Sequence, residues 1–117
     1  METYLKELEE MQNELKLLSS QKELSELRDN LHKLNSIKAR VNELIPKIQY
    51  LYNSQIGDVC SKYSDKSATV LKLMIESELK NEIRLSKMAE RVSSSCNFIA
   101  KDLITIISSI KYEMQNQ

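Results

Sequence analysis

The chain has 117 residues, the size of one domain or of one part of a larger assembly, and not of two domains. Its 17 basic and 17 acidic side chains give a formal net charge of zero with the single histidine neutral, so net charge does not favour binding to nucleic acid or to an anionic membrane. One glycine and one proline are too few for the turns of a β-sandwich or β-barrel, and a single glycine excludes glycine-rich phosphate loops.

The first predicted element is an amphipathic helix that begins near residue 2. Its apolar residues recur at helical spacing and form one stripe, at Tyr4, Leu8, Met11, Leu15 and Leu18. The N-terminal segment METYLKELEEMQNELK is acidic and lacks the charged and then apolar order of a secretory signal peptide. We therefore expect an intracellular protein, in the cytoplasm or the nucleus.

A longer stripe follows, and its spacings alternate between three and four residues. Eight of its nine positions are apolar: Leu24, Leu27, Leu31, Leu34, Lys38, Val41, Ile45, Ile48 and Tyr52. This heptad pattern is typical of a helix that packs along another helix at a shallow angle. Pro46 lies inside the stripe, and because the pattern keeps its phase on both sides, we expect a kink there and not the end of the helix.

The junction between the two stripes allows two interpretations. Six residues separate Leu18 from Leu24, whereas seven would keep the stripes in register. Ser20 and Glu23 fit a capping box, which would begin a new helix at Ser20. Alternatively, one helix continues and absorbs the slip as a local change in supercoil. We favour the continuous helix, which predicts a first arm over about residues 2–56.

Turn and capping residues cluster after this arm, in Gly57-Asp58 and in the segment SKYSDKS at 61–67. They predict a connector over about residues 57–65, with Ser64 or Asp65 as the N-cap of a last helix over about residues 66–115. The apolar stripe of that helix changes phase between Ile83 and Leu85.

The last helix is most apolar near its end. Between Val92 and Ile110, ten of nineteen residues are apolar, and Ile104 and Ile107 add a second flank to the stripe. We therefore expect more than one neighbouring helix at this end. The stretch from Phe98 to Ile110 contains Lys101 and Asp102 and is too short to span a bilayer, so no membrane insertion is expected.

Together these elements predict an all-α fold, an elongated antiparallel helical hairpin or coiled coil that forms a single helical domain over residues 1–117. Aromatic residues make up 5% of the chain, which is low for a compact globular core. Two arms of about 50 residues, at a rise of about 1.5 Å per residue, give a rod of about 75 Å.

No set of polar residues has the spacing of a catalytic or metal site. His32, the only histidine, is expected to be solvated or packed on its helix. Cys60 and Cys96 have no further cysteine or histidine at ligand spacing and are too few for a disulfide scaffold. The acidic residues Glu9-Glu10 and those between Glu76 and Glu82 are expected to be solvated faces. We therefore expect no enzyme activity, no cofactor and no metal.

The aromatic and basic residues around the connector allow a second interpretation, as a nucleic-acid site, because tyrosine rings near lysines can stack on single strands. They are Lys47, Tyr50, Tyr52, Lys62 and Tyr63. Zero net charge and the lack of a basic run favour packing at the helix end or a protein-binding patch. No nucleic-acid partner is expected.

Two groups of proteins resemble this build. The segment Leu31-His32-Lys33-Leu34-Asn35-Ser36-Ile37-Lys38-Ala39-Arg40 resembles heptad segments in short helical subunits of kinetochore, spindle and membrane-trafficking complexes. The overall pattern also resembles the WXG-type helical hairpins secreted by Gram-positive bacteria, although their Trp-x-Gly turn is missing because the chain has no tryptophan. Neither resemblance includes a specific motif, so no family is assigned.

The resemblance to complex subunits implies a non-enzymatic assembly subunit that binds helical partners in a larger intracellular complex, as a homo- or hetero-oligomer. The alternative is a small helical chaperone or targeting partner of a secreted effector. In either case the partner interface is expected at the end formed by residues 1–18 and 96–112, where the apolar face is broadest. The residues expected there are Leu8, Met11, Leu15, Phe98, Ile99, Ile104, Ile106, Ile107 and Ile110.

Overall fold

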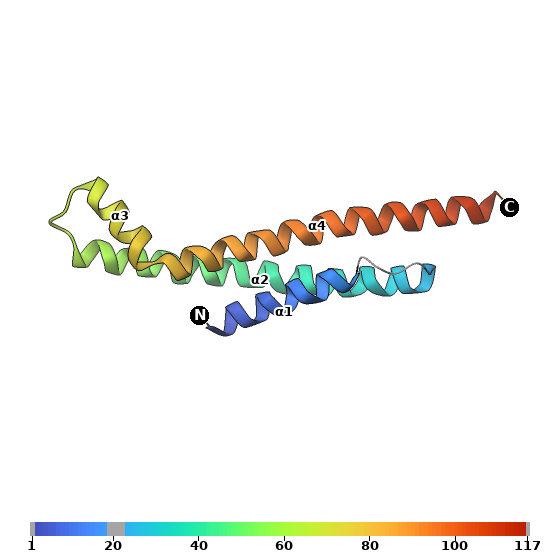
Figure 1. The fold of residues 1–117 in the computed structure, drawn as a ribbon, viewed down its shortest axis with the longest axis horizontal. Helices are drawn as coiled ribbons and strands as arrows, with labels where there is room; N and C mark the ends of the chain where they lie inside the picture. The colour runs from blue at the N-terminus through green and yellow to red at the C-terminus, as the bar shows by residue number, and fades with distance from the viewer. Residues whose placement is uncertain (1, 19–22, 117) are drawn as a thin grey trace.

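The structure is a computed structural model that describes residues 2–18 and 23–116 (Figure 1). In these ranges the chain forms α-helices and no strand. The helices are α1 (Glu2–Leu18), α2 (Leu24–Lys62), α3 (Ala68–Glu78) and α4 (Lys80–Gln115). The predicted all-α class is therefore confirmed.

The molecule is a rod in which α2 and α4 lie antiparallel along the long axis (Figure 1). Its principal extents are 74 × 24 × 18 Å, and its radius of gyration over Cα atoms is 19.9 Å. A compact sphere of this chain length would have a radius of gyration of about 13–14 Å. The predicted elongation is therefore confirmed.

The first helical segment folds back, so the prediction of one continuous arm over about residues 2–56 is wrong. α1 ends at Leu18, α2 begins at Leu24, and the two helices lie antiparallel (Figure 1). The spacing of six residues between Leu18 and Leu24, one fewer than a heptad, explains the reversal. In one continuous helix it would turn the second apolar stripe by about 100° away from the first, so the two stripes could not face the same core. Folding back lets both stripes enter one core. The alternative capping box rests on Ser20, which lies outside the described residues.

α2 buries a different stripe from the one predicted. Leu27, Leu34, Val41 and Ile48 are buried as expected. Between them, however, the buried residues are Asn30, Ile37 and Leu44, while Leu31, Lys38 and Ile45 are only half-buried.

The reason for this difference is that α2 has two neighbouring helices. Asn30 contacts α1, since its side chain donates a hydrogen bond to the carbonyl oxygen of Leu18 (3.1 Å). Lys38 lies on the other side, near enough to Cys96 of α4 to affect the pKa of its thiol. A helix that packs against two neighbours needs a wider apolar face than one heptad seam.

The turn between α2 and α3 lies later than predicted. α2 continues through Pro46, as expected, and then past Gly57 to Lys62, so the connector begins at Tyr63 and not near residue 57. Gly57 has no positive φ and behaves as an ordinary helical residue. The N-cap of the next helix is Ser67, whose hydroxyl accepts a hydrogen bond from the backbone N–H of Val70 (3.3 Å), and not Ser64 or Asp65.

The predicted last helix over about residues 66–115 is divided into α3 and α4 at Leu79. Leu79 has a non-helical ψ of 26° and is buried, with 4% of its surface exposed. The break lies just before the change of phase in the apolar stripe. It lets Leu79 and Leu85 both reach the core although they lie six residues apart.

A buried residue of α1 allows a test of the packing of α1 against α2 and α4. Leu8 is fully buried in the core that α1 shares with α2 and α4. Truncating a buried leucine to alanine removes packing contacts and leaves a cavity, so we expect Leu8→Ala to lower the free energy of unfolding by about 2–5 kcal/mol. Urea unfolding followed by circular dichroism measures this change. The exposed neighbour Glu9 provides the control: Glu9→Ala should change stability by at most about 0.5 kcal/mol. Equal effects of the two substitutions would contradict the docking of α1.

Candidate partner-binding surface

The polar residues considered for chemistry do not come together in space. His32 is exposed, Cys60 is half-buried and Cys96 is buried in the core. Within residues 2–18 and 23–116, no three His, Cys, Asp or Glu side chains are close enough to hold a metal ion. Across the same ranges, no helix combines the length and the apolar character needed to cross a membrane.

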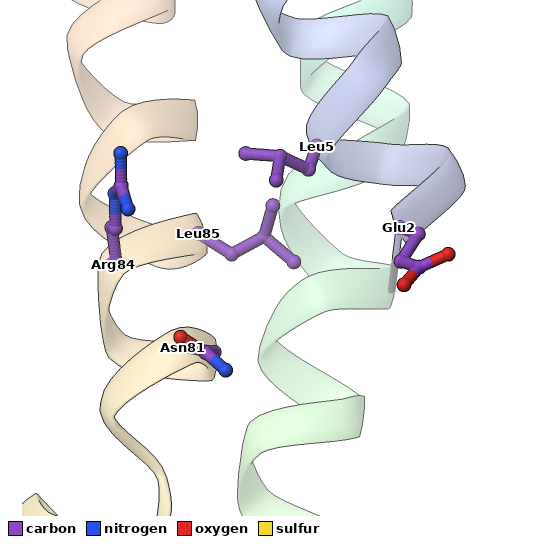
Figure 2. Close-up of a pocket in the computed structure, with 5 residues that line it drawn as sticks. All are labelled: Glu2, Leu5, Asn81, Arg84 and Leu85. Atoms are coloured by element: carbon purple, nitrogen blue, oxygen red, sulfur yellow. The ribbon is translucent and has the colours of Figure 1, made fainter.

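A small hollow lies where α1 begins, between α1 and α4 (Figure 2). Its volume is about 220 Å³, below the roughly 300–1,000 Å³ of typical small-molecule sites. Leu5 and Leu85 face each other across it, Asn81 and Arg84 lie on the α4 side, and Glu2 lies on the far side of α1. The polar groups do not converge on one point, so the hollow is a packing gap beside α1 and does not have the form of a reaction site.

The strongest electrostatic contact joins α1 to α2. Arg40 donates hydrogen bonds to both carboxylate oxygens of Glu7, the one from Nη2 to Oε2 at 3.1 Å, and a third to Glu43 Oε2 at 3.0 Å. The hydrogen bond from Arg40 lowers the pKa of Glu7 below its ordinary value, although partial burial opposes this change. The same contacts raise the pKa of Arg40. A carboxylate held ionised by arginine is a structural clamp and a poor general acid.

The lowered pKa of Glu7 predicts a pH-dependent contribution to stability. The pKa of Glu7 is lower in the folded protein than in the unfolded chain, so its ionised carboxylate stabilises the fold. This stabilisation is complete above the pKa of the unfolded chain and is lost as the pH falls through the pKa of the folded protein. We therefore expect Glu7→Gln to destabilise the protein at neutral pH and to have no effect once the pH lies below the lowered folded-state pKa of Glu7. Urea unfolding at a series of pH values measures the difference. An effect of Glu7→Gln on stability that did not change with pH would contradict the clamp.

The two cysteines lie in different environments. Cys96 has no exposed surface, and burial raises the pKa of its thiol, although the charge of Lys38 acts in the opposite direction. Cys60 is half-buried near the end of α2. We expect iodoacetamide to modify Cys60 in the native protein and to modify Cys96 only after unfolding, because alkylation requires an accessible thiolate. Mass spectrometry of the digested protein measures both rates. Equal rates in the absence of denaturant would contradict the burial of Cys96.

Exposed apolar side chains gather on the second half of α4. Among the described residues, this segment holds five of the nine large hydrophobic side chains that are exposed: Phe98, Ile104, Ile106, Tyr112 and Met114. We call these five the C-terminal surface. Their spacing places them on different sides of the helix.

The neighbouring helices do not reach all of this segment. α1 reaches only its beginning, beside Phe98, and α4 projects beyond the first residue of α2 (Figure 1). A helix that is apolar on several sides is typically enclosed by several neighbours. The C-terminal surface therefore has room and apolar area for at least one further helix.

The nine residues predicted for the partner interface fall into two groups. Leu8, Met11, Leu15 and Ile107 are buried in the core, and Ile99 and Ile110 are half-buried against it. Phe98, Ile104 and Ile106 are exposed by 68%, 52% and 44%. The second flank predicted at Ile104 and Ile107 is divided, because Ile104 is exposed whereas Ile107 is only 8% exposed. These positions leave Phe98, Ile104 and Ile106 accessible to another chain.

The predicted grouping of residues 1–18 with 96–112 also needs correction. α1 runs parallel to α4, so Leu5 lies beside Leu85 while Leu15 and Ile99 line one hollow. Only the end of α1 reaches the segment after residue 95.

Sequence reasoning missed Tyr112 and Met114, which are 69% and 61% exposed. Both lie beyond the apolar stripe that ends at Ile110, and an apolar residue off the stripe of an amphipathic helix is the sequence signal for an exposed one. No protein-family model, curated protein or solved structure is significantly similar to this chain. The geometry of the C-terminal surface therefore carries the functional argument.

Proposed function

We propose that the chain is a non-enzymatic assembly subunit, which binds a helix of a partner protein through the C-terminal surface within a larger intracellular complex. The observation that supports this proposal is the exposure of Phe98, Ile104, Ile106, Tyr112 and Met114 on a segment of which α1 reaches only the beginning. Burying a large apolar side chain contributes roughly 1.5–3 kcal/mol relative to leaving it exposed. A partner that covers several of these side chains would gain that contribution.

The chemistry of the surface suits a helix better than a small ligand. The hollow beside Ile104 is shallow, and its lining includes Thr105, Ser108 and Tyr112. Another hollow lies beside Phe98, between α4 and the end of α1. Both hollows run along a helix and are bordered by hydroxyl groups and single charges. Such hollows can hold the apolar side chains of a second helix, because helices pack with the side-chain ridges of one in the grooves of the other. We infer that the complex is of the kinetochore, spindle or membrane-trafficking type, in which short helical subunits assemble side by side.

The test uses two exposed residues on opposite sides of α4. Ile104 and Ile106 are two positions apart, which separates their side chains by about 200° around the helix. We expect Ile104→Asp with Ile106→Asp to abolish binding of stably associated partners, because a buried aspartate would lose its hydration. Affinity purification from the native cell with quantitative mass spectrometry measures the change. The single substitutions then report which side the partner covers.

The control is Ser94→Asp, which adds one carboxylate, as each single substitution does, at an exposed position of α4 before the C-terminal surface. It should keep every partner. Circular dichroism must show that all variants remain as helical as the unmodified protein. If the folded double variant retained the same partners in the same amounts, the C-terminal surface would not be the binding site and the proposal would fail.

A further inference from the structure

The pair formed by α2 and α4 has two long sides, and α1 covers one of them (Figure 1). On α4, Ile99 and Asp102 lie on the covered side, because they line a hollow together with Leu15 of α1. On α2, Arg40 lies on the covered side, because it binds Glu7. In the described ranges the remaining helix, α3, lies at the tip far from the C-terminus. No described helix therefore covers the other side of the pair beside the second half of α4.

Helical spacing shows which residues lie on that other side. Residues two positions apart are separated by about 200° around a helix. Ile104 is two positions after Asp102, and Lys38 is two positions before Arg40, so both point away from α1. Lys38 also lies near Cys96, which places it beside α4. Ile104 and Lys38 therefore mark the uncovered side of the pair, one on each helix.

Apolar residues line the uncovered side. Leu24 and Leu31 precede Lys38 at intervals of seven residues, and Ala100 lies one turn before Ile104, so they share this side. Leu24, Leu31 and Ala100 are half-buried against the core, whereas Ile104 is 52% exposed. We call Leu24, Leu31, Ala100 and Ile104 the open strip. It offers a partner apolar side chains that the chain itself covers only in part.

Positive charge lies at both ends and along the edges of the open strip. The four cations are Arg28 and Lys38 of α2 and Lys101 and Lys111 of α4. Among the described residues, none of the four forms an ion pair. The acidic residues of this half of α4 lie elsewhere: Asp102 lines the hollow with α1, and Glu113, two positions after Lys111, points away from the strip. The uncovered side is therefore apolar and locally cationic, although the chain as a whole is neutral.

The covered side shows which kind of helix this pair accepts. α1 is amphipathic and acidic, with five glutamates and two lysines among its 17 residues, and its Glu7 binds Arg40. The open strip and its cations present the same two features to an incoming helix. A nucleic acid would match the cations but has no aliphatic side chains for Leu31 and Ile104. A second copy of the chain would not supply α1, because the apolar stripe of that helix is buried in its own core.

We propose that the open strip binds an acidic amphipathic helix of the partner protein, whose apolar stripe packs on Leu31 and Ile104 and whose carboxylates pair with the surrounding lysines. The bound helix would complete a four-helix bundle with α1, α2 and α4. This inference rests on the proposed function and narrows it to one side of α4 and to one charge type of partner. Ile106 lies on the other side of α4 and is outside this contact.

The experiment measures binding of a labelled synthetic helix to the full chain by fluorescence anisotropy, with the chain titrated up to about 1 mM. The peptide has about 20 residues, enough at about 1.5 Å per residue to span the strip, with leucines at heptad positions and glutamates beside them. A control peptide carries lysine in place of each glutamate. We expect the glutamate peptide to bind at least about tenfold more tightly than the lysine peptide, and the difference to shrink as salt screens the charges.

Variants of the chain locate the contact. Ile104→Asp should abolish binding of the glutamate peptide, and Lys101→Glu with Lys111→Glu should weaken it by about tenfold or more, because two attractions become repulsions. Ser109→Asp is the control for Ile104, since it adds a carboxylate to the same half of α4 but about 140° away around the helix. Lys87→Glu, on the exposed first half of α4, is the control for the charge reversals. Both controls should bind as the unmodified chain does, and circular dichroism checks that every variant keeps its helices.

Three results would overturn the inference. The glutamate peptide could fail to bind at the highest concentration, the two peptides could bind equally, or phosphatidylserine vesicles could bind more tightly than the glutamate peptide, which would assign the cations to a lipid surface. Failure of the proposed function gives a different result, in which Ile104→Asp with Ile106→Asp keeps every cellular partner. If that double variant loses its partners while Lys101→Glu with Lys111→Glu keeps them, the proposed function stands and the acidic helix is wrong.

Discussion

The packing of α2 against two helices at once is the constraint on which the rest of the fold depends. Its central line, Leu34, Val41 and Ile48, is almost completely buried. To one side, Asn30 and Arg40 contact α1 through hydrogen bonds, and to the other side Lys38 lies near Cys96 of α4. Because both sides are occupied, α1 has to return along α2, and α4 has to lie antiparallel to α2 and parallel to α1. The described core is the volume that these three helices enclose.

Two polar contacts fix the level at which α1 lies on α2. The buried side chain of Asn30 donates to the carbonyl oxygen of Leu18, one of the last carbonyls of α1 and one that the helix itself leaves without a partner. A slip of α1 would leave this amide unsatisfied, at a cost of about 1–3 kcal/mol. Nearer the start of α1, Glu7 binds Arg40. Apolar side chains tolerate several registers, whereas these two contacts occur together in one register only.

Periodicity predicted the helical class, the elongation and half of the α2 stripe, because Leu27, Leu34, Val41 and Ile48 face the core whether one helix or two lie beside them. It did not predict the role of Asn30, since a count of apolar residues passes over a buried amide. It also misjudged the break at Leu79, where the helix is interrupted without a glycine or proline. Of the proposed surface, it identified Phe98, Ile104 and Ile106. It also assigned to that surface residues that lie in the core, among them Ile107 and the apolar stripe of α1, because periodicity does not give the number of helices that surround each residue.

The short reach of α1 gives the rod an uneven stiffness. α1 has 17 residues and covers about 25 Å of a molecule 74 Å long. Resistance to bending rises steeply with the cross-section of a rod. The middle of the molecule, where three helices pack together, is therefore its stiffest part. The two ends, where fewer helices lie side by side, bend more easily. A bending force on the rod would therefore change the angle of its two ends before it deformed the three-helix middle.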